Sequence, residues 1–198
     1  MIVSDDRKFI YVAPPKTATT SLYPFFSKLG KRSRFAKGKH NGPVGFINHH
    51  GREHWNSYFT FVSVRNPWSR MVSEYFFSIA RTPCKGIKQV ARTTDFKGFV
   101  QWRIGEKGAN GTVMHYLHNG NDLDNDFDVS YDDYIKMENI QEDFNRICNK
   151  LEIESVPLKK RNSTKHKHYV EYYDKETIDL VAEVYAKDIA MFDYKFGE

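Results

Sequence analysis

The sequence predicts an α/β fold with a parallel sheet, because the same order of strand, loop and helix occurs twice. In the first unit the apolar run FIYV, 9–12, precedes the loop APPKTATTS, 13–21, and the helical pattern of LYPFFSKL, 22–29. In the second unit YFTFVSV, 58–64, leads through RNPWSR into apolar residues at helical spacing over 68–79. Apolar strands that alternate with helices are typical of parallel sheets, whose ligands gather at the carboxyl ends of the strands.

The remaining elements are predicted in chain order from their own patterns. DFKGFVQWRI, 95–104, predicts a short helix, and the Gly, Asn and Asp residues of 105–126 predict a long loop. DYIKM, 133–137, predicts a third strand, followed by a helix with an apolar face over 140–151. A last helix is predicted to begin at Asp174 as its N-cap. This helix should bury Ile178, Val181, Val184, Tyr185 and Ile189.

Length and composition favour one globular domain over residues 1–198. The chain is 40% hydrophobic and 15% aromatic, so disorder is not expected. No apolar run approaches the roughly 20 residues of a membrane helix, and the N-terminus lacks the apolar core of a signal peptide. Cys84 and Cys148 are far apart in the sequence and lack metal-ligand spacing. Reduced thiols and a cytoplasmic location are therefore expected.

The positive charge is concentrated in two segments. The formal net charge is +5, and 28–39 and 159–168 are both strongly basic. Such segments favour polyanionic ligands, which leaves open a nucleotide, an acidic glycan or nucleic acid.

The loop over 13–21 predicts a phosphate site. A junction of strand and helix directs backbone N–H groups and the positive helix end at one place, and Lys16 adds charge. Thr17, Thr19, Thr20 and Ser21 would add hydroxyl donors. The pattern G-x-x-x-x-G-K-[ST] is absent, since position 18 is Ala and two prolines precede the lysine. No apolar strand ends in a clear magnesium-binding aspartate, and NDFDV is only a weak candidate. A nucleotide bound without a metal therefore fits the sequence better than one bound with magnesium.

These motifs are similar to those of a known enzyme family. PKTATTS resembles the 5′-phosphosulfate loop of sulfotransferases, and VRNPWSRMVSEY resembles their 3′-phosphate motif, in the same order. The likeness extends to the carbohydrate-type and bacterial branch through KH, WNSYFTFVSVRNPWSR, KMENI, RNSTKHKHY and the segment YYDKETIDLVAEVYAKDIAMFDYKF. The resemblance covers most of the chain. It implies a P-loop-NTPase-like three-layer fold, with a central parallel sheet flanked by helices.

The resemblance also implies an activity and its residues. Such enzymes move the sulfuryl group of 3′-phosphoadenosine 5′-phosphosulfate, without a metal, to an acceptor hydroxyl, here expected on a carbohydrate or glycoconjugate that can be anionic. Lys16 would act on the oxygen between phosphate and sulfate, and Arg65 and Ser73 would bind the 3′-phosphate. The implied donor-binding set is Pro15, Lys16, Thr17, Ala18, Thr19, Thr20, Ser21, Arg65, Ser73, Asn162, Lys165 and Lys167.

A general base must take the proton of the acceptor hydroxyl, and histidine suits this role near neutral pH. His40 follows Lys39 and precedes Tyr58 by eighteen residues, a spacing similar to that of the bacterial enzymes. We therefore predict His40 as the base, and His49, His50 and His54 stay open as alternatives.

Three other interpretations stay open. One is a kinase of small molecules that uses ATP and magnesium, and another is an inactive relative that binds the donor without transfer. The third is a basic nucleic-acid-binding protein. This last interpretation explains less, because electrostatic binding needs no spaced phosphate motifs. We therefore expect no nucleic-acid partner, and the sequence leaves the oligomeric state open.

Overall fold

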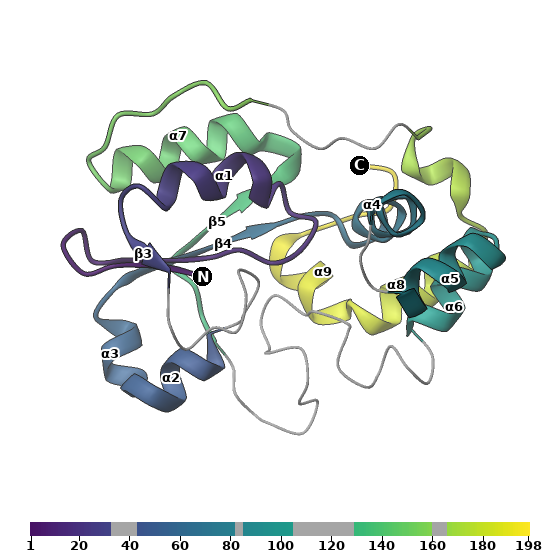
Figure 1. The fold of residues 1–198 in the computed structure, drawn as a ribbon, viewed down its shortest axis with the longest axis horizontal. Helices are drawn as coiled ribbons and strands as arrows, with labels where there is room; N and C mark the ends of the chain where they lie inside the picture. The colour runs from purple at the N-terminus through teal and green to yellow at the C-terminus, as the bar shows by residue number, and fades with distance from the viewer. Residues whose placement is uncertain (33–42, 82–84, 105–128, 160–165) are drawn as a thin grey trace. The chain divides into compact units, whose positions relative to one another are not determined.

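The structure, a computed structural model, describes residues 1–32, 43–81, 85–104, 129–159 and 166–198 (Figure 1). The chain divides into two units, the first made of Met1–Arg65 and Tyr116–Asn162 and the second of Asn66–His115 and Ser163–Glu198. That residues 1–198 form one sulfotransferase domain stays a prediction.

The first unit is built on a mixed sheet of five strands in the order β3-β1-β2-β4-β5. The strands are β1 (Ile2–Ser4), β2 (Phe9–Val12), β3 (Lys31–Arg32), β4 (Phe59–Val64) and β5 (Asp133–Lys136). The three predicted strands β2, β4 and β5 are present and pair in parallel.

The predicted central parallel sheet is confirmed in part, because β2, β4 and β5 are parallel whereas β1 pairs antiparallel with both β2 and β3. These two strands left no clear pattern in the sequence. β1 has three residues and β3 has two, and both residues of β3 are basic. Their strand conformation therefore comes from pairing at the sheet edge rather than from an apolar run.

Helices cover both faces of this sheet (Figure 1). α1 (Thr19–Phe26) and α7 (Ile140–Lys150) lie on one side, whereas α2 (Val44–His50) and α3 (Arg52–Asn56) lie on the other. A short 3₁₀ helix, η1 (Met137–Asn139), connects β5 to α7. The arrangement of helices, sheet and helices agrees with the flanked sheet that the family resemblance implies.

Aromatic side chains fill the space between the sheet and the α1 and α7 helices. Tyr11 of β2 stacks on Phe61 of β4 with ring centroids 5.2 Å apart, and Phe26 of α1 lies 4.9 Å from Tyr11. Phe25 and Phe144 join the two helices at 4.8 Å. The two aromatic residues of β2, Phe9 and Tyr11, are two positions apart. Because side chains alternate along a strand, both lie on the same face of the sheet. The core cluster contains Ile2, Phe9, Tyr11, Ala13, Leu22, Phe26, Phe61, Ile135, Phe144, Ile147 and Cys148.

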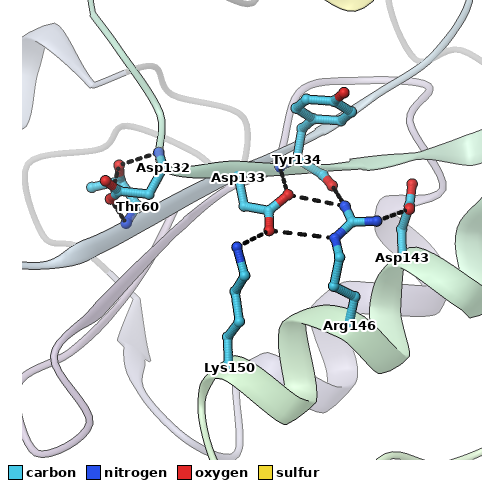
Figure 2. A network of polar contacts seen from close by, with 7 residues as sticks. All are labelled: Thr60, Asp132, Asp133, Tyr134, Asp143, Arg146 and Lys150. Carbon is cyan, nitrogen blue, oxygen red and sulfur yellow. Dashed lines mark hydrogen bonds and ion pairs between the residues drawn. The ribbon is translucent and has the colours of Figure 1, made fainter.

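An ionic network fixes α7 to β5 (Figure 2). The Asp133 carboxylate accepts hydrogen bonds from Arg146 and Lys150 at 2.9 and 2.7 Å. Arg146 also donates to the carbonyl of Tyr134 and pairs with Asp143. Burial alone would raise the pKa of the Asp133 carboxyl, but its hydrogen bonds with Arg146 and Lys150 outweigh burial and lower that pKa.

The lowered pKa of Asp133 predicts a stability loss on the acid side. A carboxyl whose pKa is lower in the folded than in the unfolded chain stabilises the fold above the unfolded pKa, about 3.9, and loses this effect as the pH falls further. Asp133→Asn should lower the free energy of unfolding by about 1–3 kcal/mol at pH 7, with a smaller difference near pH 3. Denaturant unfolding at both pH values measures this, and an equal difference at both would contradict it.

Gly30, which precedes β3, packs against the backbone of β1. A Cβ atom at this position would lie 2.6 Å from the carbonyl oxygen of Val3, which cannot rotate away. We expect Gly30→Ala to lower the free energy of unfolding by about 1–3 kcal/mol. Gly86→Ala is the matched control, because a Cβ atom there meets nothing within 4 Å. Thermal unfolding by circular dichroism should show a lower Tm for the first variant only.

The second unit is helical in the part of the chain that the structure describes. Its elements are α4 (Pro67–Ala80), α5 (Lys85–Thr93), α6 (Phe96–Ile104), η2 (Tyr169–Tyr172), α8 (Lys175–Val184) and α9 (Ala186–Phe192). Asn66 caps α4 by accepting from the backbone N–H groups of Trp68 and Ser69. The predicted cap at Asp174 is confirmed, and it forms a capping box with Thr177.

The prediction of one last helix is wrong in its length, because the helix is interrupted at Tyr185, which caps α9. Val181 and Tyr185 are buried as predicted, whereas Ile178, Val184 and Ile189 are only half-buried. Tyr185 leaves the helical conformation, with φ of −103° and ψ of 21°, so one continuous helical face cannot extend from α8 through α9. None of the helices within the described ranges is long and apolar enough to cross a membrane.

Candidate functional site

The candidate site lies at the carboxyl ends of β2 and β4. The two strands are parallel neighbours, and Val12 at the end of β2 is paired with Val62 of β4. The loop over 13–18 follows β2 and leads into α1, and Arg65 follows β4 directly. The sheet therefore brings the loop of the first motif and Arg65, near the start of the second motif, to the same edge, as predicted from two parallel strands.

The loop has an uncommon backbone for residues other than glycine. Lys16 has φ of 67° and Ala18 has φ and ψ of 56° and 24°, both in the left-handed region. Such conformations cost about 1–2 kcal/mol each, and backbone strain of this kind gathers at functional sites. Among the described residues, we find no acceptor for the backbone N–H groups of Ala18, Thr19 and Thr20. These donors at the start of α1 form a site suited to an anion.

The loop hydroxyls, in contrast, are directed at carbonyl oxygens of the protein. Thr17 and Thr19 both donate through Oγ1 to the carbonyl of Pro14, at 2.8 and 2.9 Å. Ser21 donates through Oγ to the carbonyl of Lys159 at 2.9 Å. In this arrangement the backbone N–H groups, rather than these three hydroxyls, are the donors available to an anion.

Two basic residues of the prediction meet at this loop. Arg65 is 9% exposed, and its Nη1 atom lies 3.5 Å from the carbonyl oxygen of Lys16. The distance is long for a hydrogen bond, but it places the guanidinium beside the loop. Pro15, Lys16, Ala18 and Thr20 are partly exposed. The loop edge is therefore both accessible and positively charged.

Ser73 and Lys167 belong to the second unit. Ser73 is buried in α4, and Lys167 is exposed and pairs with Glu171 at 3.3 Å. Arg70, five residues before the end of the motif, lies over the ring of Tyr185 at 5.3 Å. Ser73 and Lys167 stay predictions as donor-binding residues. Asn162 and Lys165 lie outside the described residues.

The candidate bases separate into two groups. His40 lies outside the described residues. His49, His50 and His54 form a cluster with ring centroids 4.7 Å apart for the first pair and 5.2 Å apart for the second. His54 Nε2 is 3.4 Å from the Tyr58 hydroxyl, which precedes β4. The cluster therefore lies at the amino end of β4, whereas Arg65 follows its carboxyl end, about 20 Å along a strand of six residues.

The environment of this cluster modifies its acid–base properties. Burial, together with the neighbouring imidazoles of His49 and His54, lowers the pKa of His50. Tyr58 donates to the carboxylate of Asp5 at 2.5 Å, and burial and this contact raise the pKa of its phenol to about 12. Within the described residues, no three His, Cys, Asp or Glu side chains are grouped so that they could hold a metal ion.

Sequence reasoning missed two residues beneath the loop. Tyr11 of β2 donates through its hydroxyl to Ser63 Oγ of β4 at 3.1 Å, and Ser63 Oγ lies 2.8 Å from Thr17 Oγ1. Burial raises the pKa of the Tyr11 phenol well above its usual range. The sequence did contain an indication of these contacts, because Tyr11 and Ser63 each place a hydroxyl inside an apolar strand. A buried hydroxyl needs a hydrogen-bond partner.

Comparisons with known proteins complete this description of the site. No curated protein and no solved structure matches the chain significantly. The family model described as "Sulfotransferase family" matches residues 1–195, which is nearly the whole chain. This match agrees with the placement of the loop over 13–18 and Arg65 at one sheet edge. The chain therefore belongs to the sulfotransferase family, whose members are transferases that move sulfuryl groups.

Proposed function

We propose that this protein transfers the sulfuryl group of 3′-phosphoadenosine 5′-phosphosulfate to a hydroxyl of a carbohydrate or glycoconjugate. The family match supports the sulfuryl transfer. The observation that carries the donor assignment is the loop after β2, in which left-handed Lys16 and Ala18 flank buried Thr17 beside Arg65. The donor supplies an activated sulfuryl group on its 5′-phosphate. The proposed reaction is metal-free and takes place in the cytoplasm.

The loop is proposed to bind the 5′-phosphate end of the donor. The N–H groups of Ala18, Thr19 and Thr20 fit an anionic phosphate, because they lie at the start of α1 and carry its positive end. Lys16 stabilises the negative charge that develops on the phosphate oxygen when its bond to sulfur breaks. Sulfuryl transfer resembles phosphoryl transfer in this respect, so a cation placed at the leaving oxygen supplies much of the catalysis.

Arg65 is proposed to bind the 3′-phosphate, which distinguishes the donor from ATP. Its planar guanidinium offers a fixed pair of donors that suits a phosphate. Ser73, Asn162, Lys165 and Lys167 are proposed as further donor-binding residues on the family resemblance alone.

His40 is proposed as the general base for the acceptor hydroxyl. The spacing to Tyr58 supports His40. The placement of His49, His50 and His54 at the amino end of β4 argues against those three, because a base must lie within hydrogen-bond reach of the reacting hydroxyl.

Calorimetric titration tests the donor assignment without a known acceptor. We expect metal-independent binding of adenosine 3′,5′-bisphosphate, with much weaker binding of adenosine 5′-monophosphate. ATP with magnesium is the comparison for the kinase alternative. A preference for ATP with magnesium, or no binding of the bisphosphate, would overturn the proposed donor.

A further inference from the structure

Three hydroxyls from three different segments lie in a line beneath the phosphate loop. Tyr11 belongs to β2, Ser63 to β4 and Thr17 to the loop itself, and each residue is 0% exposed. Two distances join them: 3.1 Å from Tyr11 Oη to Ser63 Oγ, and 2.8 Å from Ser63 Oγ to Thr17 Oγ1. The Pro14 carbonyl ends the line, 2.8 Å from Thr17 Oγ1. Because water does not reach these groups, each depends on the next for its hydrogen bond.

The number of hydroxyl protons fixes the direction of this line. Each hydroxyl has one proton to donate. Thr17 gives its proton to the carbonyl of Pro14, so Ser63 must be the donor to Thr17. Ser63 has then used its only proton, which agrees with Tyr11 acting as its donor. All three hydroxyls are therefore satisfied in only one arrangement of their protons, which joins Tyr11, Ser63 and Thr17 to the Pro14 carbonyl.

The line acts on the most strained part of the loop. Thr17 stands between Lys16 and Ala18, which both have left-handed backbone conformations without being glycine. Strain of this kind persists only when surrounding contacts hold it. The side chain of Thr17 is joined to β4 through Ser63 and to the loop backbone through Pro14. These are the contacts that can hold the conformation.

We infer that Tyr11, Ser63 and Thr17 are positioning residues, whose hydrogen-bonded line sets the phosphate loop in its anion-binding conformation. Thr17 then serves the donor through the loop backbone, and its hydroxyl is not a phosphate ligand. This inference rests on the proposed function, because the anion concerned is the 5′-phosphate of the nucleotide. It assigns to Tyr11 and Ser63 a role that neither motif of the sequence indicated.

The test compares two buried threonines, each of which loses its hydroxyl. Thr17→Val breaks the line, and we expect it to weaken binding of adenosine 3′,5′-bisphosphate about tenfold in calorimetric titration. Thr60→Val is the matched control. Thr60 is buried at the start of β4, away from the loop, and donates through Oγ1 to Asp132 at 2.9 Å. This control should lose stability while its affinity stays within about twofold.

Thr17→Ser keeps the hydroxyl and removes only a methyl group, so it should bind the bisphosphate within about threefold of the unmodified protein. This rescue distinguishes positioning by the hydroxyl from simple packing. If Thr17→Val does not fold, Tyr11→Phe replaces it, because it removes only the first hydroxyl of the line. We expect a loss of about threefold in affinity for Tyr11→Phe.

The outcomes distinguish a failure of the proposed donor from a failure of the positioning role. If the unmodified protein does not bind the bisphosphate, the proposed donor and the inference built on it both fail. If the unmodified protein binds and Thr17→Val or Tyr11→Phe loses no more affinity than Thr60→Val, the positioning role fails alone. Equal losses in Thr17→Val and Thr17→Ser would also overturn it, because packing would then explain the effect.

Discussion

Replacing Lys16 with alanine is expected to lower kcat about 100- to 1000-fold, while affinity for adenosine 3′,5′-bisphosphate changes little. Removal of one well-placed donor from the charge that develops in a transition state typically costs this much. The backbone N–H groups of Ala18, Thr19 and Thr20 would still bind the 5′-phosphate in the ground state. Initial rates with labelled donor, together with calorimetry on the bisphosphate, separate the two effects.

Lys175→Ala is the matched control for this variant, since Lys175 is an exposed lysine at the start of α8 and lies outside both basic segments. It should leave both kcat and affinity close to those of the unmodified protein. A loss in Lys16→Ala that appears equally in kcat/KM and in bisphosphate affinity, with kcat itself unchanged, would contradict a transition-state role for this lysine.

Arg65→Ala should mainly change the selectivity between nucleotides. A charge-assisted hydrogen bond contributes about 1.5–3 kcal/mol, so we expect the affinity for adenosine 3′,5′-bisphosphate to fall about 10- to 100-fold. Affinity for adenosine 5′-monophosphate should change far less, because this ligand lacks the 3′-phosphate. Titration of the variant and the unmodified protein with both nucleotides measures the difference.

Two further results decide whether Arg65 acts on the 3′-phosphate. Arg65→Lys keeps the charge and loses the planar pair of donors, so it should recover only part of the affinity. An equal loss for both nucleotides would place the action of Arg65 at the 5′-phosphate loop instead. That result has a structural basis too, because Arg65 lies 3.5 Å from the Lys16 carbonyl.

The parts of the fold that the sequence predicted are those with strong local patterns. β2 and β4 are apolar on both faces, and each is followed by a loop and a helical pattern. Their parallel pairing could therefore be predicted, and the structure shows it. β1 and β3 were missed because strands of two or three residues are too short to show a periodic pattern of apolar residues. Their conformation depends on pairing with strands elsewhere in the chain. The interruption at Tyr185 was missed for a similar reason, since the apolar spacing continues across it.

The site shows the same division between local and distant causes. Lys16 and Arg65 could be located from the sequence, because Lys16 lies in the loop after one predicted parallel strand and Arg65 directly follows another. The direction of the Thr17 hydroxyl could not, since it depends on Pro14 in the loop and on Ser63 in β4. The Thr17 hydroxyl was therefore predicted to donate a hydrogen bond to a phosphate, although in the structure it faces Pro14 and Ser63.

The left-handed Lys16 and Ala18 have a consequence for how the loop responds to heat. A glycine in such a place avoids steric strain, but it gives the unfolded chain more conformations to lose. That entropic penalty grows in proportion to absolute temperature, whereas steric strain between fixed atoms is mainly enthalpic. A loop made of Lys16, Thr17 and Ala18 therefore carries its cost in a form that does not increase on warming. The difference between the two costs therefore narrows on warming, while the strain of about 1–2 kcal/mol for each residue stays larger than the roughly 0.4–1 kcal/mol of entropy that a glycine would add.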